Sequence, residues 1–298
     1  MRSVSHKCRA IDHVVLPASN LGIARERLSM LGFTVAADAR HPFGTENACV
    51  FFTDKTYLEP LGVASQEDCE MAAQDGNIFV AKDQAFRARR GQDGFSGIAV
   101  SSGNAAADHR RFVDANLSAG KMLQFSRPVT LPDGTTTTAG FALAFAADSA
   151  APDLLLFAVE RVNPLPADRG SLERHANGVI GISELILSAE HPQNFTQFFL
   201  TVFDAGDMGS GEDGLSFDAA NARISISTPQ QVSALLGTAS PLGDNDLLAR
   251  AIIFRVSDLS VTAAVLAANG IATVRNDHHI LVSEAPGQGA VFLFEERP

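Results

Sequence analysis

The sequence has few basic residues, and this shortage excludes one class of function. Lys and Arg together number 23 against 34 Asp and Glu, which gives a formal net charge of −11. Binding to nucleic acid depends on clustered Lys and Arg. The densest basic stretch, residues 86–90, is short and has Asp83 and Asp93 on either side. We predict a solvated loop there and expect no nucleic-acid partner.

Cysteine is scarce, and long apolar runs are missing. Cys8, Cys49 and Cys69 have no metal-binding or redox spacing, and so few thiols suit a reducing compartment. Cys49 lies in an apolar run and is predicted to be buried. No run approaches the roughly 18 apolar residues of a membrane helix, and the polar residues 1–9 do not resemble a signal peptide. We therefore expect a cytoplasmic protein with no membrane partner.

One sequence pattern occurs four times. An apolar strand is followed by a polar turn, an amphipathic helix and further strands, and the opening strands are residues 11–16, 97–102, 182–187 and 252–256. A doubly wound α/β fold is the alternative, but several strands follow each helix and no glycine-rich phosphate loop follows the first strand. The pattern predicts an α+β fold of four βαβββ modules, paired into two open, cup-shaped mixed sheets.

A stretch rich in proline and polar residues divides the four modules into two pairs. It covers residues 162–170, and its composition is typical of linkers. We predict a first domain at 1–165, a linker at 166–177 and a second domain at 178–298. Each domain contains two modules.

Alternation of side chains along strands predicts that His13 and Glu59 face the inside of the cup. His13 shares a strand face with Val15, whereas Val14 and Leu16 share the other face and can pack on the helix. Glu59 shares a face with Tyr57 in a later strand. An imidazole and a carboxylate that meet inside the cup suit Zn²⁺, Ni²⁺, Mn²⁺ or Fe²⁺. Glu59 could instead be a general base, and a structural histidine bonded to a neighbour is the plainer alternative.

Several segments resemble a known family. The sequence is similar to the vicinal oxygen chelate superfamily, and most of all to its glyoxalase-like domain branch. The resemblance rests on residues 11–15, 31–35, 40–47 and 57–59, and on Arg174-His175-Ala176-Asn177-Gly178 in the linker. It is specific over residues 11–61 and rests mainly on the repeat pattern after residue 187.

The resemblance implies a fold, a type of site and a range of activities. In that superfamily two βαβββ modules close into a cup, and ligands from the first and last strands of modules hold a divalent ion. The ion keeps open positions for substrate oxygens. Members act as lyases, isomerases, ring-cleaving dioxygenases, epimerases or drug-modifying enzymes, and some only bind small molecules.

Two ligands alone do not hold a catalytic metal, so His13 and Glu59 need partners. Gly97 stands in the second module where His13 stands in the first, so no ligand is expected there. Glu160, at the end of the last strand of that module, is predicted as a further metal ligand. The alternative for Glu160 is a strand end that faces solvent.

Three other residues are candidates for the same site. His41 lies in a loop shaped by proline and glycine and is predicted as a catalytic residue or a further ligand. Asn47 could orient a substrate oxygen. Tyr57, the single tyrosine of the chain, could put its hydroxyl into the cavity beside Glu59, although core packing would also explain it. We assign Asn47 and Tyr57 to substrate binding.

The second half departs from the pattern. Glu184 stands where the first module has His13, and Leu293 stands where a glutamate of the family would stand. His278 and His279 are adjacent, so a regular strand would point them to opposite faces. We expect this half to be structural or to hold a degenerate site.

The sequence favours a metal-dependent enzyme of the glyoxalase type, with lyase or isomerase chemistry on a small oxygen-bearing metabolite. A metal-free protein that binds small molecules in the same cup is the alternative. An assembly role, with the second half as the surface of a homodimer, is a further alternative. No Gly-x-Ser-x-Gly, phosphate-loop or His-Glu-x-x-His motif is present.

Overall fold

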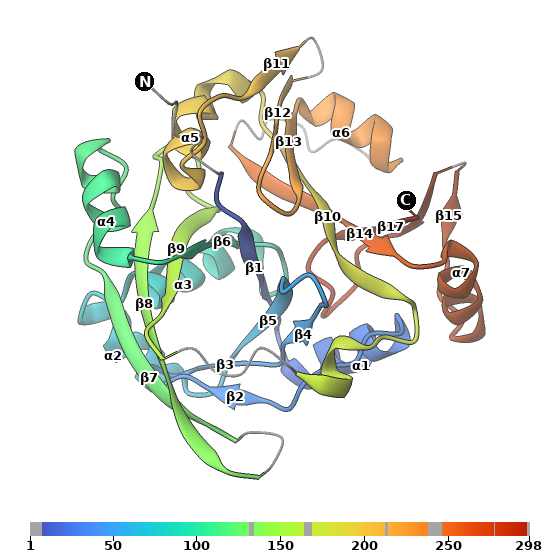
Figure 1. Cartoon of the computed structure of the whole chain (residues 1–298), viewed down its shortest axis with the longest axis horizontal. Coiled ribbons are helices and arrows are strands. Elements are labelled where there is room, and N and C mark those ends of the chain that lie inside the picture. Colours follow the sequence, from blue (N-terminus) through green and yellow to red (C-terminus); the bar gives the residue numbers. More distant parts are fainter. Residues whose placement is uncertain are drawn as a thin grey trace, which may run out of the picture.

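The computed structural model describes residues 8–130, 134–163, 169–211, 214–237, 246–276 and 278–296. Its elements alternate along the chain as two βαβββ pairs (Figure 1). The first half contains β1 (Ile11–Pro17), α1 (Leu21–Met30), β2 (Ala39–Arg40), β3 (Thr45–Asn47), β4 (Val50–Phe51), β5 (Tyr57–Val63), α2 (Gln66–Gln74), α3 (Ile78–Arg90), β6 (Gly97–Ser102), α4 (Ala105–Asp114), β7 (Leu123–Thr130), β8 (Thr136–Ala146) and β9 (Leu155–Arg161). The second half contains the 3₁₀ turns η1 (Gly170–Glu173) and η2 (Pro192–Phe195), with β10 (Val179–Ser188), α5 (Thr196–Phe203), β11 (Gly209–Gly211), β12 (Gly214–Asp218), β13 (Arg223–Ser227), α6 (Pro229–Leu236), β14 (Leu248–Val256), α7 (Leu259–Ala268), β15 (Val274–Arg275), β16 (His279–Val282) and β17 (Val291–Glu296).

Each half forms one mixed sheet with the same strand order. The first sheet runs β2-β3-β5-β1-β6-β9-β8-β7, and the second runs β11-β12-β13-β10-β14-β17-β16-β15. Within each module the first strand pairs in parallel with the last, as β1 does with β5, and the two modules meet through antiparallel first strands, as β1 does with β6. The predicted fold of four βαβββ modules in two mixed sheets is confirmed.

The polar turns after the first strands fold as N-caps. The side chain of Asn20 accepts hydrogen bonds from the backbone of the first turn of α1, and Asn104 and Asp258 do the same for α4 and α7. After α1 the chain turns at Gly32, whose φ of +87° is a left-handed conformation that glycine adopts without strain. The capping residues therefore determine where the helices of three modules begin.

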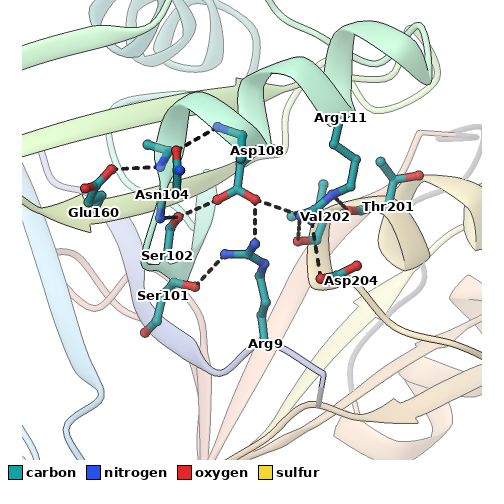
Figure 2. Close-up of polar contacts among 12 residues, drawn as sticks. Arg9, Ser101, Ser102, Asn104, Asp108, Arg111, Glu160, Thr201, Val202 and Asp204 are labelled. Carbon is teal, nitrogen blue, oxygen red and sulfur yellow. Dashed lines mark hydrogen bonds and ion pairs between the residues drawn. The ribbon is translucent and has the colours of Figure 1, made fainter. Parts of the chain in front are cut away.

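One apolar core lies between the two sheets. Val14 and Leu16 face it from β1, as the strand alternation predicted, and Phe33 contacts Phe254, Phe292 and Phe294 of the second sheet. Helix α4 lies beside α5 of the other half (Figure 2), where Arg111 donates a hydrogen bond to the carbonyl oxygen of Thr201. The two halves share their largest core.

Helices inserted between modules cover the opposite, concave face of each sheet. In the first half, α2 and α3 pack Cys69, Phe79 and Val80 against that face. In the second half, α6 packs Val232 and Leu236 on it. The first sheet keeps a pocket on this face, lined in part by β7 and β8.

The basic stretch at residues 86–90 is not a solvated loop, so that prediction was wrong. It forms the last turns of α3. Arg87 is buried and donates to Asp83, and Arg89 and Arg90 bind Asp153. Ion pairing within the fold explains the local concentration of arginine.

The segment that joins the halves is docked on the first half. His175 accepts a hydrogen bond from the backbone of Thr34, and the Asn177 amide donates to the carbonyl oxygen of Leu31. The predicted boundary at residues 165/166 lies outside the described residues, and the division into domains at 165/166 and 177/178 stays a prediction. Among the described helices, none has the length and apolar character that crossing a membrane requires.

Candidate functional site

A pocket opens on the concave face of the first sheet. Its volume is about 450 Å³, counting the part open to solvent. It is polar at one end and walled by aromatic side chains. The lining residues are His13, His41, Phe43, Asn47, Tyr57, Glu59, Phe79, Phe125, Arg127, Phe141, Leu143, Phe157 and Val159. Five of the six residues predicted for the site, namely His13, His41, Asn47, Tyr57 and Glu59, thus meet in one cavity.

His13 lies between two carboxylates. Its Nδ1 is 2.7 Å from Asp12 Oδ1, and its Nε2 is 3.3 Å from Glu59 Oε2. Burial alone would lower the pKa of His13, but the hydrogen bonds to Asp12 and Glu59 outweigh it and raise the pKa. Arg161 in turn binds both oxygens of Asp12. The two carboxylates therefore favour the protonated form of His13 and hold its ring from both sides.

Glu59 is an ionised carboxylate at the polar end of the pocket. Burial would raise its pKa, but the hydrogen bond from His13 and the positive charge of that ring lower the pKa to about 2. Asn47 donates from Nδ2 to Glu59 Oε1 at 2.5 Å. Asn47, assigned from sequence to substrate binding, therefore holds the carboxylate in place.

His41 is the second imidazole of the site and differs from His13 in charge. Its Nδ1 is 2.8 Å from the Thr45 hydroxyl, and its Nε2 is 3.8 Å from Glu59 Oε1. Burial, only partly offset by the charge of Glu59, lowers the pKa of His41 to about 4. His41 is therefore neutral near pH 7, and donation from Nδ1 to Thr45 would leave a lone pair on Nε2.

Tyr57 forms part of the pocket wall. Its ring stacks on His13 with centroids 4.4 Å apart and an interplanar angle of 21°. Strands β1 and β5 are in register with His13 opposite Tyr57 and Val15 opposite Glu59. This register brings the imidazole, the phenol and the carboxylate together, as the shared strand faces predicted.

Glu160 is not brought to the pocket. Its carboxylate accepts a hydrogen bond of 2.8 Å from the backbone nitrogen of Ala105, at the start of α4 (Figure 2). Val159, the residue before it, lines the pocket instead. Alternation along β9 therefore turns Glu160 away from the pocket, to the face that α4 covers. This position does not support its predicted role as a metal ligand.

The described residues of the second half do not repeat this site. A register shift precedes Glu184 in β10 just as one precedes His13 in β1, so the two residues are equivalent. Ser225, which takes the place of Glu59, donates to Glu184 at 2.5 Å. Separately, His279 lies 3.2 Å from Glu295, which also accepts from Ser183. The imidazole–carboxylate pair at the first-module position is thus replaced by a carboxylate–hydroxyl pair.

The donor set of the pocket suits a divalent ion, although the side chains are not assembled around one point. Across the described ranges, no group of three or more His, Cys, Asp or Glu side chains is arranged to hold a metal ion. His13, His41 and Glu59 nevertheless supply the two imidazoles and one carboxylate that Fe²⁺, Mn²⁺ and Zn²⁺ accept. Asp12 orients the far nitrogen of His13, as the outer partners of metal-binding histidines do. Binding would displace the proton on His13 Nε2.

The sequence pointed to the polar end of the pocket but not to its walls. Phe43, Phe79, Phe125 and Phe141 come from a loop, the inserted α3 and the β7–β8 hairpin. Arg127, on the same face of β7 as Phe125, also lines the pocket. Only the spacing Phe125-x-Arg127 in a strand could have indicated that both side chains face one side.

Comparison with known families gives one match. A family model described as "Glyoxalase-like domain" matches residues 11–203, which is more than half of the chain. A search of curated proteins found no match.

Solved structures share the fold at low identity. One is a hypothetical protein from Staphylococcus aureus, with a TM-score of 0.65 at 13% identity over 96% of this chain and 99% of that one. A mutant 4-hydroxymandelate synthase from Streptomyces coelicolor has a TM-score of 0.60 at 14% identity, covering 98% and 94%. A Mn(II)-bound glyoxalase from Novosphingobium aromaticivorans has a TM-score of 0.53 at 12% identity, covering 97% and 83%. At these identities the likeness concerns the fold alone.

Proposed function

Because the chain belongs to the glyoxalase-like domain family of the vicinal oxygen chelate superfamily, we propose that it is a metal-dependent enzyme of the glyoxalase type. Its substrate would be a small oxygen-bearing molecule bound in the pocket of the first half, and its chemistry that of a lyase or isomerase. One observation carries the proposal. Two imidazoles, those of His13 and His41, meet the ionised carboxylate of Glu59 in a pocket walled by aromatic rings.

The proposed metal ligands are His13, Glu59 and His41. Glu160 is left out because its carboxylate is bonded to Ala105 outside the pocket. When bound, a divalent ion would supply Lewis acidity toward a carbonyl or enediolate oxygen. The relative recorded as a Mn(II)-bound glyoxalase is consistent with such an ion in this fold.

The residues of the chain have separate tasks in the proposed reaction. Asp12 and Arg161 hold His13 in one orientation, and Asn47 holds Glu59. Glu59 is the group able to accept a proton from the substrate, since it is ionised near pH 7 and has a second carboxylate oxygen besides the one that would bind the ion. The lone pair of His41 Nε2 would be taken up by the ion. The aromatic walls exclude water, which strengthens the electrostatic interactions at the polar end.

Metal-free binding of a small molecule is the second candidate, and one observation favours it. Both ring nitrogens of His13 contact carboxylates, which raises its pKa, and the ring must lose a proton before it can bind a metal ion. A divalent ion must therefore compete with a stabilised proton. The two candidates differ in their affinity for metal.

Metal titration tests the proposal. Chain stripped with a chelator is titrated with Zn²⁺, Ni²⁺, Mn²⁺ and Fe²⁺ at pH 7.5, as wild type, as His13→Ala and as Glu184→Ala. We expect one of the ions to bind the wild type, His13→Ala to weaken it at least ten- to a hundredfold, and Glu184→Ala to leave it unchanged. Small ketones and glutathione thioacetals are then screened for turnover that a chelator abolishes.

Each outcome has a consequence. If no ion binds, the proposal of a metal-dependent enzyme is rejected, and metal-free binding of a small molecule becomes the better-supported function. If an ion binds with the same affinity to His13→Ala, the ligand assignment is wrong. Glu184 is the matched control because it occupies the equivalent strand position in the second half.

A further inference from the structure

One charged side chain of the pocket is left without a partner. Arg127 of β7 lines the cavity, and its Nε atom is buried with no hydrogen-bond partner. Within the described part of the chain, no carboxylate forms an ion pair with it. A buried guanidinium nitrogen that bonds to nothing costs free energy unless something else satisfies it. The position of Arg127 in the cavity makes a ligand the natural partner.

The charged groups at the polar end of the pocket are paired with one another. Asp12 contacts His13 and Arg161, and Glu59 contacts His13 and accepts from Asn47. Arg127 is not part of this group of contacts. Its guanidinium is therefore left to bind a ligand in the cavity.

The phenylalanine side chains of the pocket indicate which kind of group the rest of the ligand contains. Phe43, Phe125 and Phe141 form a continuous aromatic group, with Phe43 and Phe125 centroids 5.2 Å apart and Phe125 and Phe141 stacked at 5.1 Å. Phe79 and Phe157 extend the wall toward β1. Aromatic rings favour flat apolar groups, and these rings line the same cavity as Arg127.

We propose that the pocket selects an aromatic carboxylate, with Arg127 binding the carboxylate and the phenylalanine walls enclosing the ring. This inference rests on the proposed function, because it names the substrate class of the same pocket. The guanidinium fork matches a carboxylate with two parallel hydrogen bonds. The rest of the ligand then lies toward Glu59 and His41, which line the same cavity.

Matched probes test the proposal by binding alone. Phenylacetate, its neutral isostere phenylacetamide, and acetate are titrated calorimetrically into wild type, Arg127→Gln, Arg127→Lys and Arg40→Gln. Arg40 is an exposed arginine of the neighbouring β2 that does not line the pocket. Thermal unfolding of each variant shows beforehand that it is folded.

We expect phenylacetate to bind wild type about tenfold or more tightly than phenylacetamide, and tenfold or more tightly than acetate. The preference over the amide falls to about one in Arg127→Gln, survives in part in Arg127→Lys and is unchanged in Arg40→Gln. Equal binding of acid and amide, a preference that persists in Arg127→Gln, or binding of neither aromatic probe would each overturn the proposal.

The same titrations with chelator and with Mn²⁺ separate this inference from the proposed function. If the chain binds no metal but prefers phenylacetate to phenylacetamide in an Arg127-dependent way, the carboxylate site is supported and the proposed metal-dependent enzyme is rejected. If the chain binds metal through His13 but binds the acid and the amide equally, the proposed enzyme is supported and the carboxylate site is rejected.

Discussion

At the residue scale, the site depends on two histidines whose pKa values are shifted in opposite directions. The pKa of His13 is raised because Asp12 and Glu59 flank it, and the pKa of His41 is lowered because it is buried with one hydroxyl partner and one carboxylate farther away. A difference of this kind is typical of sites that need one acid and one base or ligand. The direction of each shift follows from the number and distance of the carboxylates around the ring.

His41 makes the metal-free chain less stable in acid. Its pKa is about 4 in the folded chain against 6.5 in the unfolded one, so the unfolded chain takes up a proton first as the pH falls. The free energy of unfolding therefore decreases between pH 6.5 and pH 4, with an upper bound of about 3 kcal/mol for this group. We expect His41→Gln to remove that slope in urea unfolding with chelator present.

His191→Gln is the control, because His191 is exposed far from the pocket. It should unfold with the pH dependence of wild type. A slope in His41→Gln equal to that of wild type would show that His41 titrates normally.

Strand alternation predicted which side chains face the pocket but not what holds them. His13, Tyr57 and Glu59 follow from the period of two in β1 and β5. Asp12 would face away from His13 in a regular strand. The register of β1 against β6 shifts between Ile11 and His13, and this irregularity accompanies the contact of the Asp12 carboxylate with the ring. The position of such a bulge cannot be predicted from a single sequence.

At the element scale, the last strand of a module caps the helix of the same module. Glu160 of β9 accepts a hydrogen bond from the first residue of α4, and Glu296 of β17 accepts one from the first residue of α7. Both contacts put a carboxylate at the positive end of a helix dipole. The glutamate that resembled a metal ligand in sequence thus has a structural contact that is repeated in the second half.

Removing this cap should cost stability without affecting the pocket. We expect Glu160→Ala to lower the free energy of unfolding by about 1 kcal/mol, and Glu160→Gln, which keeps an acceptor oxygen, to lower it less. Glu296→Ala should have a smaller effect because its side chain is more exposed. Chemical denaturation and metal titration measure the two properties separately. Loss of metal binding in Glu160→Ala would restore Glu160 as a ligand.

The inserted helices were the part of the fold that the repeat pattern could not predict. The βαβββ modules recur, so their strands and caps could be recognised by comparison within the chain. Helices α2, α3 and α6 occur between modules and are not part of the repeated βαβββ pattern. Helix α3 supplies Phe79 to the pocket, and so the shape of the pocket depends on contacts across the sheet that local sequence does not specify.

At the scale of the whole molecule, the two halves are held together by a single core. Phe33 and Phe52 of the first half contact Phe254 of the second, and His175 of the connecting segment packs against both. This core lies on the faces of the sheets opposite the two cups. The second half therefore packs against the back of the sheet that carries the site, and the residues that line the pocket all come from the first half.

A shared core predicts that the halves unfold together. Phe33→Ala removes a buried ring and should lower the free energy of unfolding by about 3–5 kcal/mol. Urea unfolding followed by circular dichroism should show one transition in both wild type and variant, moved to lower urea in the variant. Two separated transitions, with only the first moved, would contradict the shared core.

The most direct test of the account compares Glu59→Gln with Glu184→Gln by metal stoichiometry. Both variants remove one carboxylate from equivalent regions of the two sheets, and elemental analysis after equilibrium dialysis counts the ions bound to each chain. The account predicts one ion per chain in wild type and in Glu184→Gln, and none in Glu59→Gln. Two ions per wild-type chain, or loss of the ion in Glu184→Gln with retention in Glu59→Gln, would contradict it.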